Sequence, residues 1–277
     1  MSGRRRLDLE MVRRGLASSR EQAQAAVAAG GVLVSGAVAD KASRLVQPGD
    51  AVILAGPRAR FVSRGGEKLD AALDRFSIDV TGRRALDAGA STGGFTDCLL
   101  QRGAAAVVAV DVGRGQLHQR VAADPRVESH ERTNIRHVTL AQLGGTPFEV
   151  VVADLSFISL RTVAPALLDR LSGLGADVVV LVKPQFEAGR QAASAGRGVI
   201  RDPNIWSRTL VDVLGALVDQ GAAMMGLMVS PLTGADGNVE FLVHLAAHTP
   251  APSHDDPPAA IATVVAEATA AHGIEHR

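Results

Sequence analysis

The sequence predicts an α/β protein of two parts, a small α+β domain over residues 1–58 followed by a doubly wound sheet domain over residues 67–248. Three observations carry this prediction. Short helix and strand patterns succeed one another in the first part, and from residue 81 onward β and α patterns alternate, which is typical of a mainly parallel sheet with helices on both faces. The last two strand patterns are separated only by a turn, which predicts an antiparallel hairpin at one edge of that sheet.

The composition is that of an ordinary globular protein, with 277 residues of which 47% are hydrophobic and 21% are charged. Cys98 is the one cysteine, so an internal disulfide and a cysteine-based zinc site are excluded, and no metal is expected. The arginines at the start have no apolar stretch behind them, and no run of about 18 apolar residues occurs in the sequence. We therefore expect neither secretion nor membrane insertion, and the expected location is the cytoplasm.

The charge is distributed unevenly, although the formal net charge is zero. Residues 1–60 hold ten of the 29 Lys and Arg but only five of the 29 Asp and Glu. A basic block of this kind favours a polyanion-binding module, because Lys and Arg displace condensed counterions from phosphates. A solvated charged face explains the same counts equally well, so charge alone leaves both interpretations open.

The first domain is predicted to begin with two short helices over residues 6–28, because apolar residues recur there at helical spacing. Ser18 or Ser19 is expected to cap the second helix. The period then changes, and strand patterns follow at residues 32–34 and 51–54.

The order RLDLEMVRRGLASSREQAQAAVAAGGVLVSG, followed by a Pro-Gly-Asp turn and a closing strand, resembles an S4 RNA-binding domain. The resemblance covers about the first fifth of the chain and implies that a set of basic side chains faces RNA phosphates. Arg6 and Arg20 are foremost in that set. Its members are Arg4, Arg5, Arg6, Arg14, Arg20 and Lys41.

Six strand patterns make up the second domain. They lie at residues 85–87, 106–111, 150–154, 178–182, 225–229 and 239–245. The antiparallel pair at the end is typical of class I methyltransferases, whose Rossmann-like sheet this pattern resembles, and unusual for nicotinamide-binding sheets. Residues 59–66 are expected to link the domains, and residues 249–277 to form a second linker and a C-terminal helix over residues 258–272.

The first strand of this sheet runs into a glycine-rich turn, DAGASTGGFTD over residues 87–97. Small residues let the backbone approach a ligand, and a helix that begins there offers unpaired N–H groups. A turn with a purely structural role can have the same sequence pattern. Asp111 closes the next strand 24 residues after Asp87, a spacing suited to a carboxylate that binds ribose hydroxyls. Because the turn is not GxGxxG, the expected cofactor is S-adenosyl-L-methionine rather than NAD.

Four polar residues stand where such a sheet presents side chains to one cleft. They are Lys68, Asp154, Lys183 and Glu240. Asp154 and Lys183 end strands, and ligands of doubly wound sheets bind at the carboxyl ends of strands. A lysine placed directly after an apolar run is costly unless it has a function. Structural alternatives exist for three of them: Asp154 as a helix cap, Glu240 on an exposed face, and Lys68 as a surface lysine.

Ribose methylation is the chemistry that this set favours. Lys183 is the expected base for a ribose hydroxyl, because desolvation and the nearby Lys68 favour its neutral amine. Asp154 and Glu240 are expected to orient the lysine side chains and the ribose. Methylation of base nitrogens usually employs an Asn/Asp-Pro-Pro-aromatic motif, whereas residues 154–157 read DLSF. Methylation of base carbons requires a cysteine nucleophile, and Cys98 is expected to be packed in a helix.

The motifs SRGGEKL, DAGASTGGFTD, VADLSFISL, LVKPQFEAG and GNVEFL, in this order after an S4-like segment, resemble the TlyA family, whose second domain is related to FtsJ-type ribose methyltransferases. The resemblance implies that the four polar residues form a catalytic tetrad. It further implies cofactor contacts, which together with the glycine-rich turn are expected at Gly89, Ser91, Gly93, Gly94, Phe95, Asp111, Asn134 and Asp154. FtsJ-type turns have Pro and Trp where this chain has Thr92 and Phe95, so the details of the turn differ.

The family resemblance implies 2′-O-methylation of cytidines in ribosomal RNA of the large subunit and also of the small one, with an influence on capreomycin and viomycin sensitivity. The expected partners are ribosomal RNA or ribosomal subunits, with no membrane and no protein partner. Because the family also carries the name haemolysin, a pore-forming protein is one alternative. A non-catalytic RNA-binding assembly factor is another.

Overall fold

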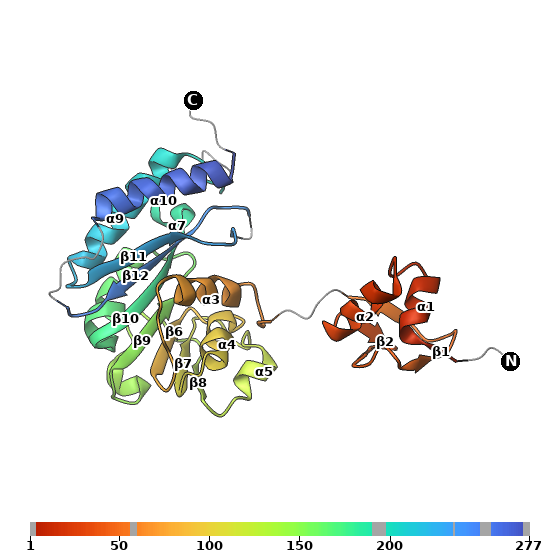
Figure 1. Cartoon of the computed structure of the whole chain (residues 1–277). Coiled ribbons are helices and arrows are strands. Elements are labelled where there is room, and N and C mark those ends of the chain that lie inside the picture. The colour runs from red at the N-terminus through yellow and green to blue at the C-terminus, as the bar shows by residue number, and fades with distance from the viewer. Residues whose placement is uncertain (1–3, 56–59, 190–197, 235, 250–255, 274–277) are drawn as a thin grey trace. The chain divides into compact units, whose positions relative to one another are not determined.

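The computed structural model describes residues 4–55, 60–189, 198–234, 236–249 and 256–273. The chain divides into two compact units, Met1–Arg60 and Phe61–Arg277 (Figure 1).

The first unit is a small α+β fold. Its helices and strands are β1 Arg5–Arg6, α1 Leu7–Arg13, α2 Arg20–Ala28, β2 Val32–Val34, β3 Ala37–Val38, β4 Leu45–Val46 and β5 Val52–Leu54. The antiparallel strands β3, β2 and β5 form one sheet, and β1 pairs with β4. The two predicted helices are confirmed, and Ser19 caps the second, its hydroxyl accepting a hydrogen bond from the Gln22 N–H at 3.1 Å.

A small apolar core holds this unit together. Leu7 and Met11 of α1 are fully buried against Val27 of α2 and against Val32 and Val34 of β2. The apolar positions of α1 lie four residues apart and so share one face of the helix, which leaves the charged positions of the same helix for polar contacts. The basic side chains of the unit therefore lie outside this core.

The second unit contains a mixed sheet of seven strands in the described part of the chain. The strands are β6 Arg84–Ala88, β7 Ala106–Val110, β8 Val127–His130, β9 Phe148–Ala153, β10 Ser172–Val182, β11 Ala223–Val229 and β12 Phe241–Ala246. Their order is β11-β12-β10-β9-β6-β7-β8, and β12 runs antiparallel to both of its neighbours. The predicted doubly wound sheet with an antiparallel end is thus confirmed.

Helices cover both faces of this sheet. They are α3 Gly65–Arg75, α4 Gly94–Gln101, α5 Gln119–Ala122, the short η1 Leu140–Leu143, α6 Leu160–Ala164 with its π-helical continuation η2 Pro165–Leu171, α7 Pro184–Glu187, α9 Pro203–Val218 and α10 Pro257–Ala271. Neighbouring residues of a strand point to opposite faces, so Val150 packs in one core with Leu69 of α3 and Leu99 of α4. Its neighbour Val151 packs in a second core with Trp206 of α9.

The structure differs from the sequence prediction in several places, and in the first unit the short strands β1, β3 and β4 were not predicted. The edge strand β8 was not predicted, because it contains the polar run Glu-Ser-His. Strand β10 begins at Ser172, six residues earlier than predicted. The expected linker over residues 59–66 overlaps the second unit, because Phe61 is buried in its core and α3 already begins at Gly65. The predicted C-terminal helix is present as α10, which buries Ile261 against the sheet domain.

No helix among the described residues is both long and apolar enough to span a membrane. The described residues likewise contain no group of three or more His, Cys, Asp or Glu side chains arranged to hold a metal ion.

Candidate active site and RNA-binding surface

A cavity of about 580 Å³ lies where β6, β7 and β9 end. Asp111 lines it directly after β7, and both oxygens of its carboxylate are held by backbone N–H groups. Ser91 N donates to Oδ2 at 2.8 Å, and Gly113 N donates to Oδ1 at 2.6 Å. Val112 and Ile135 supply apolar walls. A cavity of this size with an apolar body and a fixed acid suits a nucleoside-sized ligand.

The glycine-rich turn allows the backbone to approach this cavity closely. Gly89 has φ +89°, and a Cβ there would lie 2.6 Å from the carbonyl oxygen of Asp154. Gly93 has φ +88° and precedes α4, where a Cβ would lie 2.7 Å from the Leu117 side chain. Both positions therefore require glycine, because other residues rarely adopt a positive φ and would collide with these neighbours.

Asp87 lies beneath the turn and is completely buried. Its Oδ2 accepts a hydrogen bond from the Thr96 hydroxyl at 2.6 Å, whereas Oδ1 has no hydrogen-bond partner among the described residues. Burial raises the pKa of Asp87 to about 7; the Thr96 hydrogen bond opposes this shift, and the carboxylates of Asp154 and Asp111 add to it. An acid with a spare oxygen, close to two further acids, favours a ligand that carries positive charge.

A second cavity of about 510 Å³ adjoins the first. The two cavities share Gly89, Ser91, Asp154 and Ser156 in their linings. Basic side chains line the second cavity as well, from Arg64, Lys68 and Lys183. The first cavity is thus bordered by acids and the second largely by cations, and they meet at Asp154.

The four predicted catalytic residues form two ion pairs at this second cavity. Lys68 of α3 pairs with Glu240, which precedes β12, at 2.5 Å between Nζ and Oε2. Lys183, at the end of β10, pairs with Asp154, at the end of β9, at 2.5 Å between Nζ and Oδ1. Only 10% of the Lys68 side chain and 11% of the Lys183 side chain are exposed. Two lysines are therefore held in a largely desolvated site, each by one carboxylate.

Sequence reasoning missed several residues of the site. The Lys183 ammonium also donates to Ser156 Oγ at 3.1 Å, and Gln185 Nε2 donates to Glu240 Oε1 at 3.5 Å. Phe157 borders the first cavity with a side chain that is 90% exposed, and its ring centroid lies 5.0 Å from that of Phe186. These residues stand inside the motifs DLSF and KPQF, so their position beside the predicted acid and base was the available signal.

The predicted cofactor residues surround the two cavities. Those that line the first are Gly89, Ser91, Asp111, Asn134 and Asp154. Gly94 and Phe95 line the second, together with Gly89, Ser91 and Asp154. Gly93 caps the helix that follows. The fold thus brings together residues that are up to 65 positions apart in the sequence.

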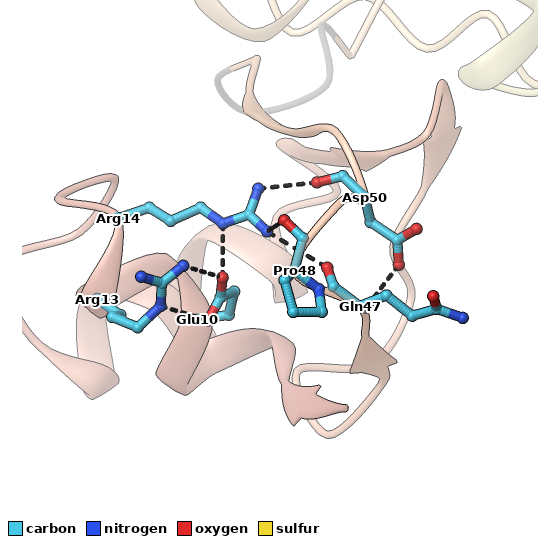
Figure 2. A network of polar contacts seen from close by, with 6 residues as sticks. All are labelled: Glu10, Arg13, Arg14, Gln47, Pro48 and Asp50. Atoms are coloured by element: carbon cyan, nitrogen blue, oxygen red, sulfur yellow. Dashed lines mark hydrogen bonds and ion pairs between the residues drawn. The ribbon is translucent and has the colours of Figure 1, made fainter. Parts of the chain in front are cut away.

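The basic residues of the first unit have different surroundings. Arg4 and Lys41 are exposed, and Arg6 and Arg20 both bind the carboxylate of Asp8. Arg14 turns inward: its guanidinium donates to Glu10 Oε1 at 2.7 Å and to the carbonyl oxygens of Asp50 and Pro48 at 2.8 and 3.0 Å (Figure 2). The contacts of Arg14 therefore do not support the expectation that it faces RNA, because its guanidinium already fastens α1 to the turn before β5.

Comparisons with known proteins agree with this division of the chain. The FtsJ-like methyltransferase family matches residues 61–247, and the S4 domain family matches residues 5–52. The "16S/23S rRNA (cytidine-2'-O)-methyltransferase TlyA" of Mycobacterium tuberculosis is 49% identical over 250 residues, which cover 90% of this chain and 92% of the relative.

Solved structures show the same likeness. A Streptococcus thermophilus protein that carries the name haemolysin is 40% identical, covers 99% of this chain and 98% of its own, and superimposes with a TM-score of 0.74. A Listeria monocytogenes protein described as an S-adenosylmethionine dependent methyltransferase is 16% identical, covers 68% of this chain and all of its own, and has a TM-score of 0.50. The second likeness concerns the fold alone.

Proposed function

The chain belongs to the TlyA family, which joins an S4 domain to an FtsJ-like methyltransferase domain, and from this premise we propose that it methylates the ribose 2′-hydroxyl of cytidines in ribosomal RNA. The observation that carries the proposal is that two lysines, each paired with one carboxylate, line the second cavity, and that the Lys183–Asp154 pair lies where the two cavities meet. A pore-forming role and a purely RNA-binding role gain no support from such a site, because neither needs buried lysines beside a nucleoside-sized cavity.

The first cavity fits S-adenosylmethionine, which supplies, when bound, an electrophilic methyl group on a positively charged sulfur. Asp111 is placed to accept hydrogen bonds from ribose hydroxyls, as acids at this strand end do in nucleotide-binding sheets. Asp154, which lines this cavity, is proposed to favour the positively charged sulfonium, and the fully buried Asp87 to add to this effect from beneath the turn without contacting the cofactor. The remaining contacts are proposed for Gly89, Ser91, Gly93, Gly94, Phe95 and Asn134.

The second cavity is proposed to hold the target ribose. A ribose hydroxyl is a poor nucleophile, so a base must take its proton as the oxygen–methyl bond forms and the sulfur–methyl bond breaks. Lys183 is the proposed base, held in place by Asp154 and Ser156. Lys68, which lines this cavity and is held by Glu240, is proposed to orient the ribose, with Gln185 fixing the Glu240 carboxylate.

RNA phosphates are proposed to bind the first unit through its outward basic side chains. These are Arg4, Arg5, Arg6, Arg20 and Lys41, whereas Arg14 is left out because its contacts are internal. Ribosomal subunits, large and small, are the proposed substrates. Because such substrates are cytoplasmic, the cytoplasm is the proposed location of the protein. The expected influence on capreomycin and viomycin sensitivity stays a prediction.

Transfer of labelled methyl from S-adenosylmethionine to purified ribosomal subunits tests the proposal. We expect the wild type to label RNA and Lys183→Ala to lose this labelling. Arg75→Ala is the control, because Arg75 is exposed on α3, the helix of Lys68, but lines neither cavity, so it should retain activity to within about twofold. Absence of label on both subunits and on naked RNA, despite measurable cofactor binding, would reject the proposal.

A further inference from the structure

We propose that Asp8 is a positioning residue that holds Arg6 and Arg20 side by side as one phosphate-binding site. This inference rests on the proposed RNA-binding function of the first unit. It concerns a buried acid in a unit whose function calls for cations.

Asp8 is fully buried at the start of α1, although a charged side chain is costly to bury unless it is paired. Arg6 binds it in a bidentate manner, with Nε 3.1 Å from Oδ1 and Nη2 2.9 Å from Oδ2. Arg20 Nε donates to Oδ2 at 3.0 Å, and Gln24 Nε2 donates to the same oxygen at 3.0 Å. The backbone N–H of Leu9 donates to Oδ1 at 2.9 Å. One carboxylate therefore ties the chain before α1 to the helix α2.

Sharing one oxygen brings the two arginines close together. Arg6 Nη2 and Arg20 Nε are 2.9 and 3.0 Å from Asp8 Oδ2, so these nitrogens lie no more than 5.9 Å apart. Two guanidinium groups at this distance repel one another unless an anion lies between them. The hydrogen bonds from Arg6 hold the pKa of Asp8 well below its usual range, against the opposing effect of burial, so the acid stays charged.

Both arginines keep donors for a ligand. Their side chains are 38% and 54% exposed, and within the described residues neither the Arg6 Nη1 nor the two Arg20 Nη atoms have a polar partner. Arg guanidinium groups bind phosphate through two parallel N–H donors, and the strength of such contacts depends on the orientation of the group. Because Arg6 and Arg20 are fixed on Asp8 through their Nε edges, their other donors face outward. The two arginines and Asp8 together carry one net positive charge, which matches the single negative charge of a phosphodiester.

Glu10 is the comparable acid of the same unit, but only one of its two arginines is largely exposed, since the Arg13 side chain is 52% exposed and that of Arg14 only 21%. It is also buried, and it also binds two arginines, with Arg13 Nη2 at 2.6 Å and Arg14 Nε at 2.7 Å (Figure 2). The remaining donors of Arg14, however, point to backbone carbonyls of the turn before β5. Glu10 thus fastens the fold through Arg14, whereas both arginines on Asp8 keep donors on the protein surface.

Whether the loss of the Asp8 charge weakens or strengthens RNA binding distinguishes a positioning role from an effect of net charge alone. Removing an acid beside a polyanion-binding surface strengthens binding if only net charge matters, because one repulsion is lost. Positioning predicts the opposite result for Asp8→Asn, which keeps the size of the side chain but cannot neutralise two guanidinium groups. Glu10→Gln removes the same charge from the same unit and disturbs the same number of arginines, so it is the matched control.

The experiment measures kcat and KM of the full chain for methyl transfer to purified large ribosomal subunits that lack the modification. We expect Asp8→Asn to raise KM about tenfold and to leave kcat within about twofold, as for the loss of one charge-assisted contact. Glu10→Gln should leave both within about twofold, and S-adenosylmethionine affinity should not change in either variant. In a background that lacks both arginines, Arg6→Gln with Arg20→Gln, adding Asp8→Asn should change KM by less than about twofold.

A KM for Asp8→Asn that equals or falls below the wild-type value would overturn the inference, and so would an equal loss in the background without the two arginines. Should Asp8→Asn fail to fold, Gln24→Ala decides, because Gln24 is exposed and its side chain donates a hydrogen bond to Asp8. A rise in KM of about threefold supports the inference, and an unchanged KM overturns it. Failure of the wild type to methylate the subunits is a different result, since it rejects the proposed function itself.

Discussion

In the first unit two partly exposed arginines, Arg6 and Arg20, share the buried carboxylate of Asp8. In the second unit Lys68 and Lys183 line a cavity, and each pairs with a carboxylate of its own. The arginine side chains are several times more exposed than the lysine side chains. An arginine stays charged in any protein environment, but a lysine can become a neutral amine when it is desolvated. The same kind of ion pair therefore suits phosphate binding in one unit and proton transfer in the other.

Lys183→Arg tests the difference most severely, because it keeps the charge and removes the base. We expect kcat to fall by about 10²- to 10⁴-fold, the usual contribution of a general base, with KM for RNA little changed. Single-turnover methyl transfer measures the chemical step directly. A variant that keeps more than about a tenth of the wild-type rate would show that Lys183 acts only as a cation.

Glu240→Gln tests whether the lysine pairs depend on their carboxylates for stability. It leaves the buried Lys68 ammonium without a counter-charge, which should cost about 3–5 kcal/mol in the free energy of unfolding. Replacing both partners, Lys68→Met with Glu240→Leu, should cost less than the single change, because no charge is then left buried. Urea unfolding followed through the second unit measures both, and a loss below about 1 kcal/mol for Glu240→Gln would contradict the account.

Asp87 is a third kind of acid in the molecule, because it is buried near the same cavities without a cation among the described residues as its partner. Its Oδ2 accepts a hydrogen bond from the Thr96 hydroxyl, and its Oδ1 has no hydrogen-bond partner in the described part of the chain. Its pKa is raised by burial to about 7, above its value in the unfolded chain, so the contribution of Asp87 to stability is fully present below about pH 4 and is lost as the pH rises through 7. The loss reaches about 4 kcal/mol at most. Asp87→Asn should flatten the dependence of the Tm on pH over this range, and an unchanged slope would contradict the assignment.

Arg20→Lys carries the smallest expected effect. It keeps the charge but loses the planar set of donors that Asp8 holds on one side and phosphate meets on the other. We expect KM for ribosomal subunits to rise about threefold at constant kcat, since an exposed cation contributes modestly. An unchanged KM would contradict the proposed phosphate site, because the planar donors of Arg20 would then be dispensable.

Much of the second unit could be predicted from sequence because its strands end in single polar residues. An apolar run followed by Asp154 or Lys183 predicts both the strand and the edge of the sheet at which the side chain lies, and parallel strands bring such ends together. The polar edge strand β8 escaped prediction, because its edge position allows Glu128 and His130 to face solvent in part. Edge strands need less apolar patterning than central ones.

The pairings within the site could not be predicted, since they depend on tertiary contacts. Lys68 and Glu240 are 172 residues apart, and only the return of β12 between β10 and β11 brings them together. Arg14 illustrates the same limit in the first unit, because its carbonyl partners lie 33 to 36 residues away in a turn. Whether an arginine faces a ligand or the fold depends on such distant acceptors.

Nucleoside analysis of the reacted RNA shows whether the protein methylates a ribose. Large ribosomal subunits are incubated with the wild type and methyl-labelled S-adenosylmethionine, and their RNA is digested to nucleosides and separated. A methyl group on the 2′-oxygen also blocks alkaline cleavage at that position, which provides a second readout. The account predicts label in 2′-O-methylcytidine with alkaline resistance at the same nucleotide, whereas label in a base-methylated nucleoside would contradict it.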